Sequence, residues 1–442
     1  MSVSSSRAKR PAASLAANAS LAPVVQTTSA NMATDAAALP GQSRPANALS
    51  AAQLLCLLAI VLVALNLRPA LAAIGPLLQA IQGDISLSFS AASLLTTLPV
   101  LAMGLLSFVG FRLAAPLGLE RTVALALVML ALATALRFWV PNASWLISTA
   151  LLAGVAIAMI QTLLPAIIKA HFAEKTPLIM GFYVTAIMSG AAIAAMSTPL
   201  MASSLSWRMS LGSWVLLAVF ALLIWCWQLK APKAASQAEA PAPAMSFWRS
   251  KRSWQLAVFF ALGTSCYVSV LAWLAPYAIE QGLTAKQAGL LLGFLTSCEV
   301  VAGLFFPWLA MRSRDKRQVI AILCLLQLVG FSGLALLPDT ALLLWVAMIG
   351  LGIGGIFPLA IIITMDHVDN PLQAGRLTAF VQGIGYIMAA FTPWIAGGLR
   401  DSLQSFTLAW LLLAASSVLA LYLGTKFSVA SYRQHFAVTS PA

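Results

Sequence analysis

The stretch that decides the fold is AAQLLCLLAIVLVALNLRPALAAIGPLLQ, residues 51–79. It carries a single charged side chain, Arg68, in an otherwise apolar run. A helix rises about 1.5 Å per residue, so about 20 apolar residues cross the ~30 Å hydrocarbon core of a bilayer. The stretch is therefore long enough to form a membrane-spanning helix, with Arg68 inside it.

Similar runs continue through most of the chain. Charged residues make up 8% of the sequence and hydrophobic residues 61%, whereas a soluble domain carries ~25% charged residues. The runs are continuously apolar, without the alternation of β-barrel strands. The sequence predicts an all-α membrane protein with twelve transmembrane helices near 51–79, 88–111, 122–140, 144–168, 178–202, 209–229, 254–279, 286–310, 318–337, 340–365, 376–398 and 403–425.

The longest predicted connection divides these spans into two sets of six. Residues 230–252 contain three prolines and five Lys or Arg residues, which is typical of a linker outside the membrane. We therefore expect six-helix bundles at 51–229 and 253–426, joined by a cytoplasmic linker at 230–252. Residues 1–50, rich in Ala, Ser and Pro, are predicted to be a disordered cytoplasmic tail, and 427–442 a second cytoplasmic tail.

The basic residues give the predicted spans an orientation. Four of the 25 Lys and Arg residues fall on one side of the membrane, Arg68 lies within a span, and the remaining 20 fall on the other side. Because cytoplasmic loops carry the excess of Lys and Arg, both termini are predicted to be cytoplasmic and the chain to span the inner membrane. The net charge of +13 has this origin, so no nucleic-acid partner is expected. We expect a monomer.

The two predicted halves resemble each other at an offset of 194 residues. Gly181 matches Gly375, Ala195 matches Ala389, and the Thr-Pro pair at 198–199 matches the pair at 392–393. Spans five and eleven are thus expected to be equivalent. Parallel repeats of this kind indicate two bundles around a central cavity, with one bundle rocking against the other.

Arg68 is the first candidate for a functional residue. A charge near the bilayer centre costs ~2.5–3.5 kcal/mol on insertion scales, so it usually faces a cavity or a partner. Pro69 lacks a backbone N–H and leaves the carbonyl of Leu65 free, while Asn66 adds an amide nearby. We interpret Arg68 as an anion-binding group with Asn66 beside it. The alternative is that Arg68 binds freed carbonyls or an acid on another helix and only fixes the packing.

Glu299 lies near the middle of predicted span eight, the only carboxylate deep within a span. One hypothesis is that Glu299 is ionised as the partner of Arg68, and a second is that it carries a proton coupled to transport. The third is that it stays neutral and hydrogen-bonded between packed helices. Gln161 and Gln382 are candidates for hydrogen bonds to a substrate, although bonds between helices explain them equally well. Trp273 is a candidate for the cavity wall, with packing as the alternative.

Two polar clusters lie at the cytoplasmic ends of spans. Asp366 and His367 follow span ten, and a basic cluster follows span eight. We interpret the first as a gate or an interfacial pair. The second orients the chain, with an inter-bundle latch as a further hypothesis for Arg314, Asp315 and Arg317. Neither cluster, nor any of the five cysteines, has metal-site spacing, so no metal and no cofactor is expected.

Several segments together resemble the major facilitator superfamily, and within it the cyanate transporter branch, which also includes 2-nitroimidazole transporters. The segments are Asn66-Leu67-Arg68-Pro69, Gly75-Pro76-Leu77-Leu78, Leu94-Leu95-Thr96-Thr97-Leu98-Pro99-Val100, Thr176-Pro177-Leu178-Ile179-Met180-Gly181, Asp366-His367 and Gln382-Gly383-Ile384-Gly385. The resemblance implies alternating-access transport of cyanate, a small linear anion.

The residues and the resemblance agree on a negatively charged substrate. The leading hypothesis is a secondary transporter that moves cyanate or a similar small anion. In one form of this hypothesis, the anion moves together with a proton. The second is an exporter of small organic compounds such as nitroimidazoles or drugs. A membrane sensor or intramembrane enzyme is disfavoured, because no catalytic constellation and no soluble output domain is found.

Overall fold

The computed structural model describes residues 50–172, 175–228, 247–313, 315–368, 371–429 and 432. Every element of secondary structure in these ranges is a helix. Within them, twelve helical segments are long and apolar enough to cross a membrane, from Ala52–Asp84 to Thr407–Thr425. The predicted number of spans is therefore confirmed, with boundaries that differ by a few residues.

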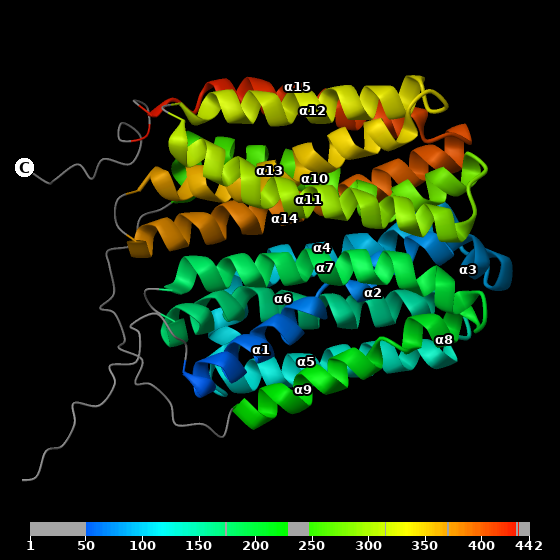
Figure 1. Ribbon diagram of the computed structural model, residues 1–442, viewed down its shortest axis with the longest axis horizontal. Coiled ribbons are helices and arrows are strands. Elements are labelled where there is room, and N and C mark those ends of the chain that lie inside the picture. The colour runs from blue at the N-terminus through cyan, green and yellow to red at the C-terminus, as the bar shows by residue number, and fades with distance from the viewer. Residues whose placement is uncertain are drawn as a thin grey trace, which may run out of the picture. The chain divides into compact units, whose positions relative to one another are not determined.

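The helices of the two halves form two groups (Figure 1). The first half consists of α1 (Ala51–Leu65), α2 (Pro69–Ala72), the 3-10 helix η1 (Gly75–Leu77), α3 (Leu78–Asp84), α4 (Phe89–Ala114), α5 (Leu119–Ala135), η2 (Leu136–Trp139), α6 (Ala143–Phe172), α7 (Thr176–Ala202), α8 (Trp207–Gly212) and α9 (Val215–Gln228). The second half consists of η4 (Phe247–Arg249), α10 (Lys251–Glu280), α11 (Ala285–Arg312), α12 (Lys316–Leu336), α13 (Leu342–Asp366), α14 (Pro371–Leu403) and α15 (Thr407–Thr425).

Polar caps set the starts of several spans. Ser88 and Thr284 accept hydrogen bonds from the backbone of the first turns of α4 and α11, and Ser50 does so for α1. These caps satisfy N–H groups that a helix leaves free at its N-terminus. Ser88 and Thr284 stand in short connections at one end of the molecule, together with the 403–407 connection. We call this the distal end, and the end with the start of α1 and the end of α15 the proximal end.

The two halves meet along two seams. One is formed by α4 and α14, and the other by α7 and α11. Because α4 and α11 are the second spans of their halves, and α7 and α14 the fifth, each seam pairs a second span with a fifth span. At the α7–α11 seam a Cβ on Gly289 would lie 2.3 Å from the carbonyl oxygen of Ala195, so the backbones approach as closely as glycine allows.

Parts of the predicted linker and tails fall outside the described residues, namely 1–49, 229–246 and most of the C-terminal segment. The first helical turn before the second half, η4, begins at Phe247, and α10 begins at Lys251, slightly before the predicted bundle boundary. Phe427 and Tyr432 of the predicted C-terminal tail are buried against the second half, where Tyr432 stacks on His367.

Candidate functional site

The first span is broken near its middle. Helix α1 ends at Leu65, and the chain passes through Asn66, Leu67 and Arg68 before α2 begins at Pro69. The N–H of Leu67 donates to Ala64 in a tighter turn, and the carbonyl of Leu65 lies against Gly190 of α7, where a Cβ would approach its oxygen to 2.2 Å. The missing N–H of Pro69 explains the break.

A second arginine stabilises this break. Arg137 in η2 is 1% exposed, and its Nη1 donates to the carbonyl of Ala70 at 2.9 Å, while its Nε donates to Thr149 Oγ1 at 3.4 Å. An unpaired backbone carbonyl is costly in hydrocarbon, so this bond supports the irregular backbone. Arg137 therefore stabilises the short helix that follows the break, a role that was not predicted for it from the sequence.

Arg68 is itself buried, at 4% exposure. Its guanidinium lies over the ring of Tyr267 on α10, with Cζ 5.2 Å from the ring centroid. Its Nε is buried and has no hydrogen-bond partner among the described residues. A planar guanidinium held on an aromatic face keeps its N–H groups directed for a carboxylate-like or other anionic ligand.

Glu299 lies on α11, in the other half from Arg68, and is 2% exposed. Both of its carboxyl oxygens are buried without a hydrogen-bond partner in the described part of the chain. It is close enough to Arg68 for an electrostatic interaction. A Cβ on Gly354 of α13 would meet the Glu299 backbone at 2.3 Å, so tight helix packing fixes the position of this carboxyl group.

Three tyrosines complete the surroundings of Arg68. Tyr183 on α7, Tyr267 on α10 and Tyr386 on α14 all lie within its electrostatic range. The hydroxyl of Tyr267 is buried and has no partner in the described ranges. These residues were not predicted from the sequence, although two of them carry a signal: tyrosines in membrane proteins gather at the interfaces, whereas Tyr267 and Tyr386 lie near the middle of their helices.

Residues 54–393 match the family model of the Major Facilitator Superfamily. The chain belongs to this superfamily. It is a secondary transporter and not an enzyme. Its helices are similar to those of the D-xylose-proton symporter, with a TM-score of 0.70 at 14% identity, covering 85% of this chain and 98% of that chain. They are also similar to a bacterial homologue of the human lysosomal transporter Spinster, with a TM-score of 0.67 at 14% identity, covering 89% and 100%.

Sequence relatives place the chain in the cyanate-transporter branch of the superfamily. It is 38% identical to the cyanate transport protein CynX of Escherichia coli over 379 residues, which is 86% of this chain and 98% of that protein. It is 29% identical to the 2-nitroimidazole transporter of Escherichia coli over 367 residues, covering 83% of this chain and 93% of that protein. The family resemblance found in the sequence is confirmed.

Three other residues predicted to bind substrate, Asn66, Gln161 and Gln382, lie in different surroundings. The amide nitrogen of Asn66 donates to the carbonyls of Leu62 and Leu217, at 2.8 and 3.3 Å. Gln161 on α6 is half-buried, and its Oε1 has no partner in the described chain. Gln382 is half-buried on α14, one turn before Tyr386. Asn66 therefore holds backbone, whereas the Gln161 oxygen remains available to a ligand.

Trp273 lies on α10, which packs against the first span. It is closer to the distal end than Arg68 is. Its indole N–H donates to the carbonyl of Pro393 at 2.9 Å, and its ring lies 5.8 Å from that of Phe89 and 5.5 Å from that of Phe406. It belongs to an aromatic cluster at the end of α10, α14 and α4. This position separates it from the Arg68 surroundings.

The predicted proximal gate residues pair within the second half. Asp366 forms an ion pair with Lys316 of α12, and His367 accepts from Arg252 Nε at 3.0 Å while its Nδ1 contacts the Ile363 carbonyl at 2.6 Å. The other residues show the same local pairing. Asp315 binds Arg317, whose hydrogen bond holds the pKa of the Asp315 carboxyl below its ordinary value. Arg314 lies outside the described residues.

A metal centre was not predicted for this transporter. Across the described ranges, no group of three or more His, Cys, Asp or Glu side chains lies close enough together to hold a metal ion. The polar groups of the Arg68 surroundings are instead one cation, one carboxyl and phenol hydroxyls. This set suits recognition of a small anion, together with transfer of a proton.

Proposed function

We propose that the chain transports a small anion, cyanate above all, by alternating access between its two halves. The observation that carries the proposal is a set of buried polar groups without protein partners among the described residues: Arg68 Nε, the Tyr267 hydroxyl and the Glu299 carboxyl oxygens. Buried polar groups are normally hydrogen-bonded. Unsatisfied groups of both halves gathered at a broken helix are what a substrate site needs.

The charge of the substrate follows from Arg68. The carbonyl of Ala70, just after the helix break, accepts its hydrogen bond from Arg137 and not from Arg68. A buried guanidinium with no acid within ion-pair distance among the described residues favours an anionic ligand. In this proposal Gln161 and Gln382 are further substrate ligands, and Asn66 and Trp273 support the surrounding backbone.

Proton coupling is part of the proposal. Moving one negative charge inward against a membrane potential costs ~2.3 kcal/mol per 100 mV, and symport of a proton cancels that charge. Glu299 is the proposed proton carrier, because it is a buried carboxyl group of the other half that interacts electrostatically with Arg68. The proposal also includes cytoplasmic termini, which the excess of Lys and Arg on one side of the membrane supports, so that the distal end would face outward from the inner membrane.

Uptake of labelled cyanate into proteoliposomes tests the proposed function. We expect uptake above that of empty vesicles, and faster uptake when the outside is acidified, because a proton enters with the anion. The full chain is reconstituted, and labelled cyanate inside is measured with and without an imposed proton gradient. Uptake no higher than in empty vesicles under both conditions contradicts the cyanate assignment.

A second candidate function is export of small nitroaromatic compounds. The observation that favours it is the presence of Tyr183, Tyr267 and Tyr386 close to Arg68, because aromatic rings stack with planar organic ligands. The 2-nitroimidazole transporter, a relative along most of the chain, fits the same interpretation. Competition of 2-nitroimidazole with cyanate in the uptake assay distinguishes a shared site from a cyanate-only site.

Replacing Glu299 with glutamine tests the proton step. Glutamine keeps the shape of the side chain and removes the titratable group. We expect Glu299→Gln to bind cyanate but to lose the acceleration of uptake by external acid. The initial uptake rate is measured as a function of external pH at fixed membrane potential. The matched control is Asp339→Asn, an exposed acid in the connection after α12. An unchanged pH response in Glu299→Gln shows that another group carries the proton.

A further inference from the structure

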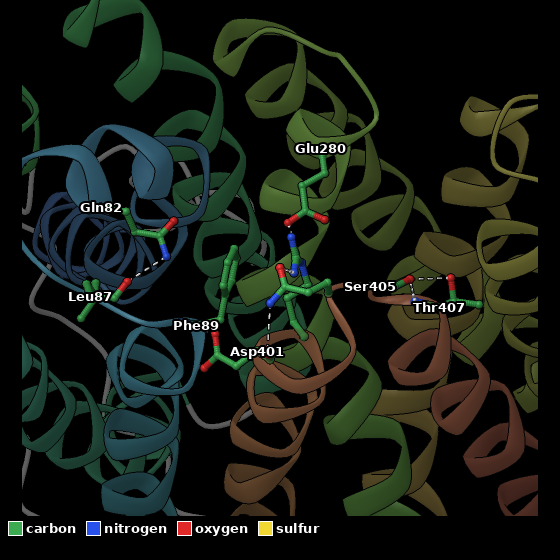
Figure 2. Close-up of polar contacts among 9 residues, drawn as sticks. Gln82, Leu87, Phe89, Glu280, Asp401, Ser405 and Thr407 are labelled. Atoms are coloured by element: carbon green, nitrogen blue, oxygen red, sulfur yellow. Dashed lines mark hydrogen bonds and ion pairs between the residues drawn. The ribbon is translucent and has the colours of Figure 1, made fainter.

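At the distal end, one carboxylate of the second half caps a helix of the first half. Asp401 Oδ1 accepts the N–H of Phe89 at 3.1 Å, and Oδ2 accepts the N–H of Ser90 at 2.8 Å and its hydroxyl at 2.5 Å. Figure 2 shows Asp401 beside Phe89, with Glu280 across from them. These three residues, Phe89, Ser90 and Asp401, are called the distal clasp.

The presence of an acid at position 401 is explained by α4, to which it binds, and not by α14, to which it belongs. Asp401 lies in the last turn of α14, where the partial negative charge of the helix end disfavours a carboxylate. The first turn of α4 carries the opposite partial charge and free N–H groups. The hydroxyl of Ser88, the cap residue of α4, accepts the N–H of Ala91 at 3.1 Å. Asp401 accepts the N–H groups of Phe89 and Ser90, the two residues before Ala91.

The neighbours of the distal clasp connect the same two halves. The Arg400 guanidinium lies over the ring of Phe89, with Cζ 4.9 Å from the centroid, and its Nε donates to Glu280 at 2.8 Å. A Cβ on Gly397 would lie 2.8 Å from the Phe89 carbonyl oxygen, so α14 approaches the start of α4 at a glycine. Backbone, charge and ring contacts therefore converge on one turn of α4.

We propose that the distal clasp holds the distal ends of the two halves together and breaks whenever the central site opens toward that end. This inference rests on the alternating access of the proposed function. It does not depend on which anion is carried. On opening, water replaces the clasp contacts, since the N–H groups of Phe89 and Ser90 and the Asp401 carboxylate all lie near the end of the helices. The contact is thus reversible without leaving a buried group unpaired.

The test uses Asp401→Asn, which keeps the side-chain size but removes the charge and one of the two acceptor oxygens. Ser93 lies one turn below Ser90 and is 1% exposed, so it is covered while the distal clasp is closed. A single cysteine at Ser93 reports opening through its reaction with a maleimide. The full chain is studied in lipid nanodiscs, with the native cysteines replaced by alanine.

We expect Asp401→Asn to increase the labelling rate at position 93 about 10-fold, because hydrogen bonds to a charged group are lost. Asp339→Asn, the same substitution in a distal connection away from the seams, is expected to leave the rate unchanged. An equal labelling rate in wild-type, Asp339→Asn and Asp401→Asn proteins overturns the proposal.

A second reporter separates opening from loss of the fold. Cys324 on α12 is native and 1% exposed, far in sequence from the distal clasp. With Cys324 as the single cysteine, Asp401→Asn is expected to label no faster than the wild type. Faster labelling at both positions 93 and 324 means general loosening and also overturns the proposal. Both labelling assays are carried out without substrate. Their outcome can therefore be interpreted even if the chain does not take up cyanate.

Discussion

Arg68→Gln is expected to lower the initial rate of cyanate uptake at low cyanate concentration by about 10-fold to about 100-fold, while leaving the amount of folded protein in the membrane unchanged. Hydrogen bonds to a charged group are worth ~1.5–3 kcal/mol, which corresponds to an affinity loss of ~10-fold to ~100-fold. We expect the fold to tolerate the change, because the hydrogen bond to the carbonyl of Ala70 after the break comes from Arg137 and is kept in the variant. The measurements are initial uptake rates and the elution profile of the purified protein.

Two further variants sharpen the interpretation of Arg68→Gln. Arg68→Lys keeps the charge but loses the planar group that lies on Tyr267, so we expect partial uptake with a raised KM. Lys286→Gln removes an exposed charge at the distal end and is the matched control with normal uptake. Full activity in Arg68→Gln assigns Arg68 to packing and removes the anion site from the proposed function.

The span pattern was predictable because a bilayer imposes it residue by residue. Continuous apolar runs have one stable solution in hydrocarbon, which is the helix. The burial of Arg68 followed from the same argument, since it lies too far from either end of its span to reach water. The break at Pro69 was predictable from a missing N–H, and the structure adds that α1 ends four residues earlier, at Leu65.

The surroundings of Arg68 are set by the packing of helices against one another. Helices that are apolar on every face show little periodicity in their sequence, so the sequence does not indicate which face packs against which neighbour. Tyr183, Tyr267 and Tyr386 come from three helices that meet only in the folded protein. Arg137 is one of the four Lys and Arg residues counted on the non-cytoplasmic side, but its side chain is buried and binds the carbonyl of Ala70. Tertiary contacts, not local patterns, determine these roles.

The contacts between the halves illustrate the same limit. The charged residues proposed as a proximal latch are conspicuous in sequence, yet the described ones pair within the second half. Asp401 looks like an ordinary interfacial charge until the start of α4 is placed against it. Asp401 binds backbone N–H groups at the start of α4. Because almost every residue has a backbone N–H, the sequence of α4 does not show that an acid from another helix binds there.

Gly190→Ala is expected to lower both the thermal stability and the uptake rate. An added Cβ would lie 2.2 Å from the carbonyl oxygen and 3.0 Å from the carbonyl carbon of Leu65, both of them backbone atoms. Helix α7 must then move away from the break that positions Arg68. Such overpacking costs ~1–3 kcal/mol, which exceeds the ~0.5–1 kcal/mol that alanine gains over glycine within a helix.

Gly181→Ala provides the matched control on the same helix. No heavy atom lies within 4 Å of the position its Cβ would take, so only the helix-propensity gain remains. We expect its Tm to equal or exceed that of the wild type and its uptake to be unchanged. Tm in detergent and cyanate uptake in proteoliposomes are measured for both variants. Equal behaviour of the two variants contradicts the close approach of α7 to Leu65, whereas a loss confined to Gly190→Ala ties the geometry of the helix break to transport.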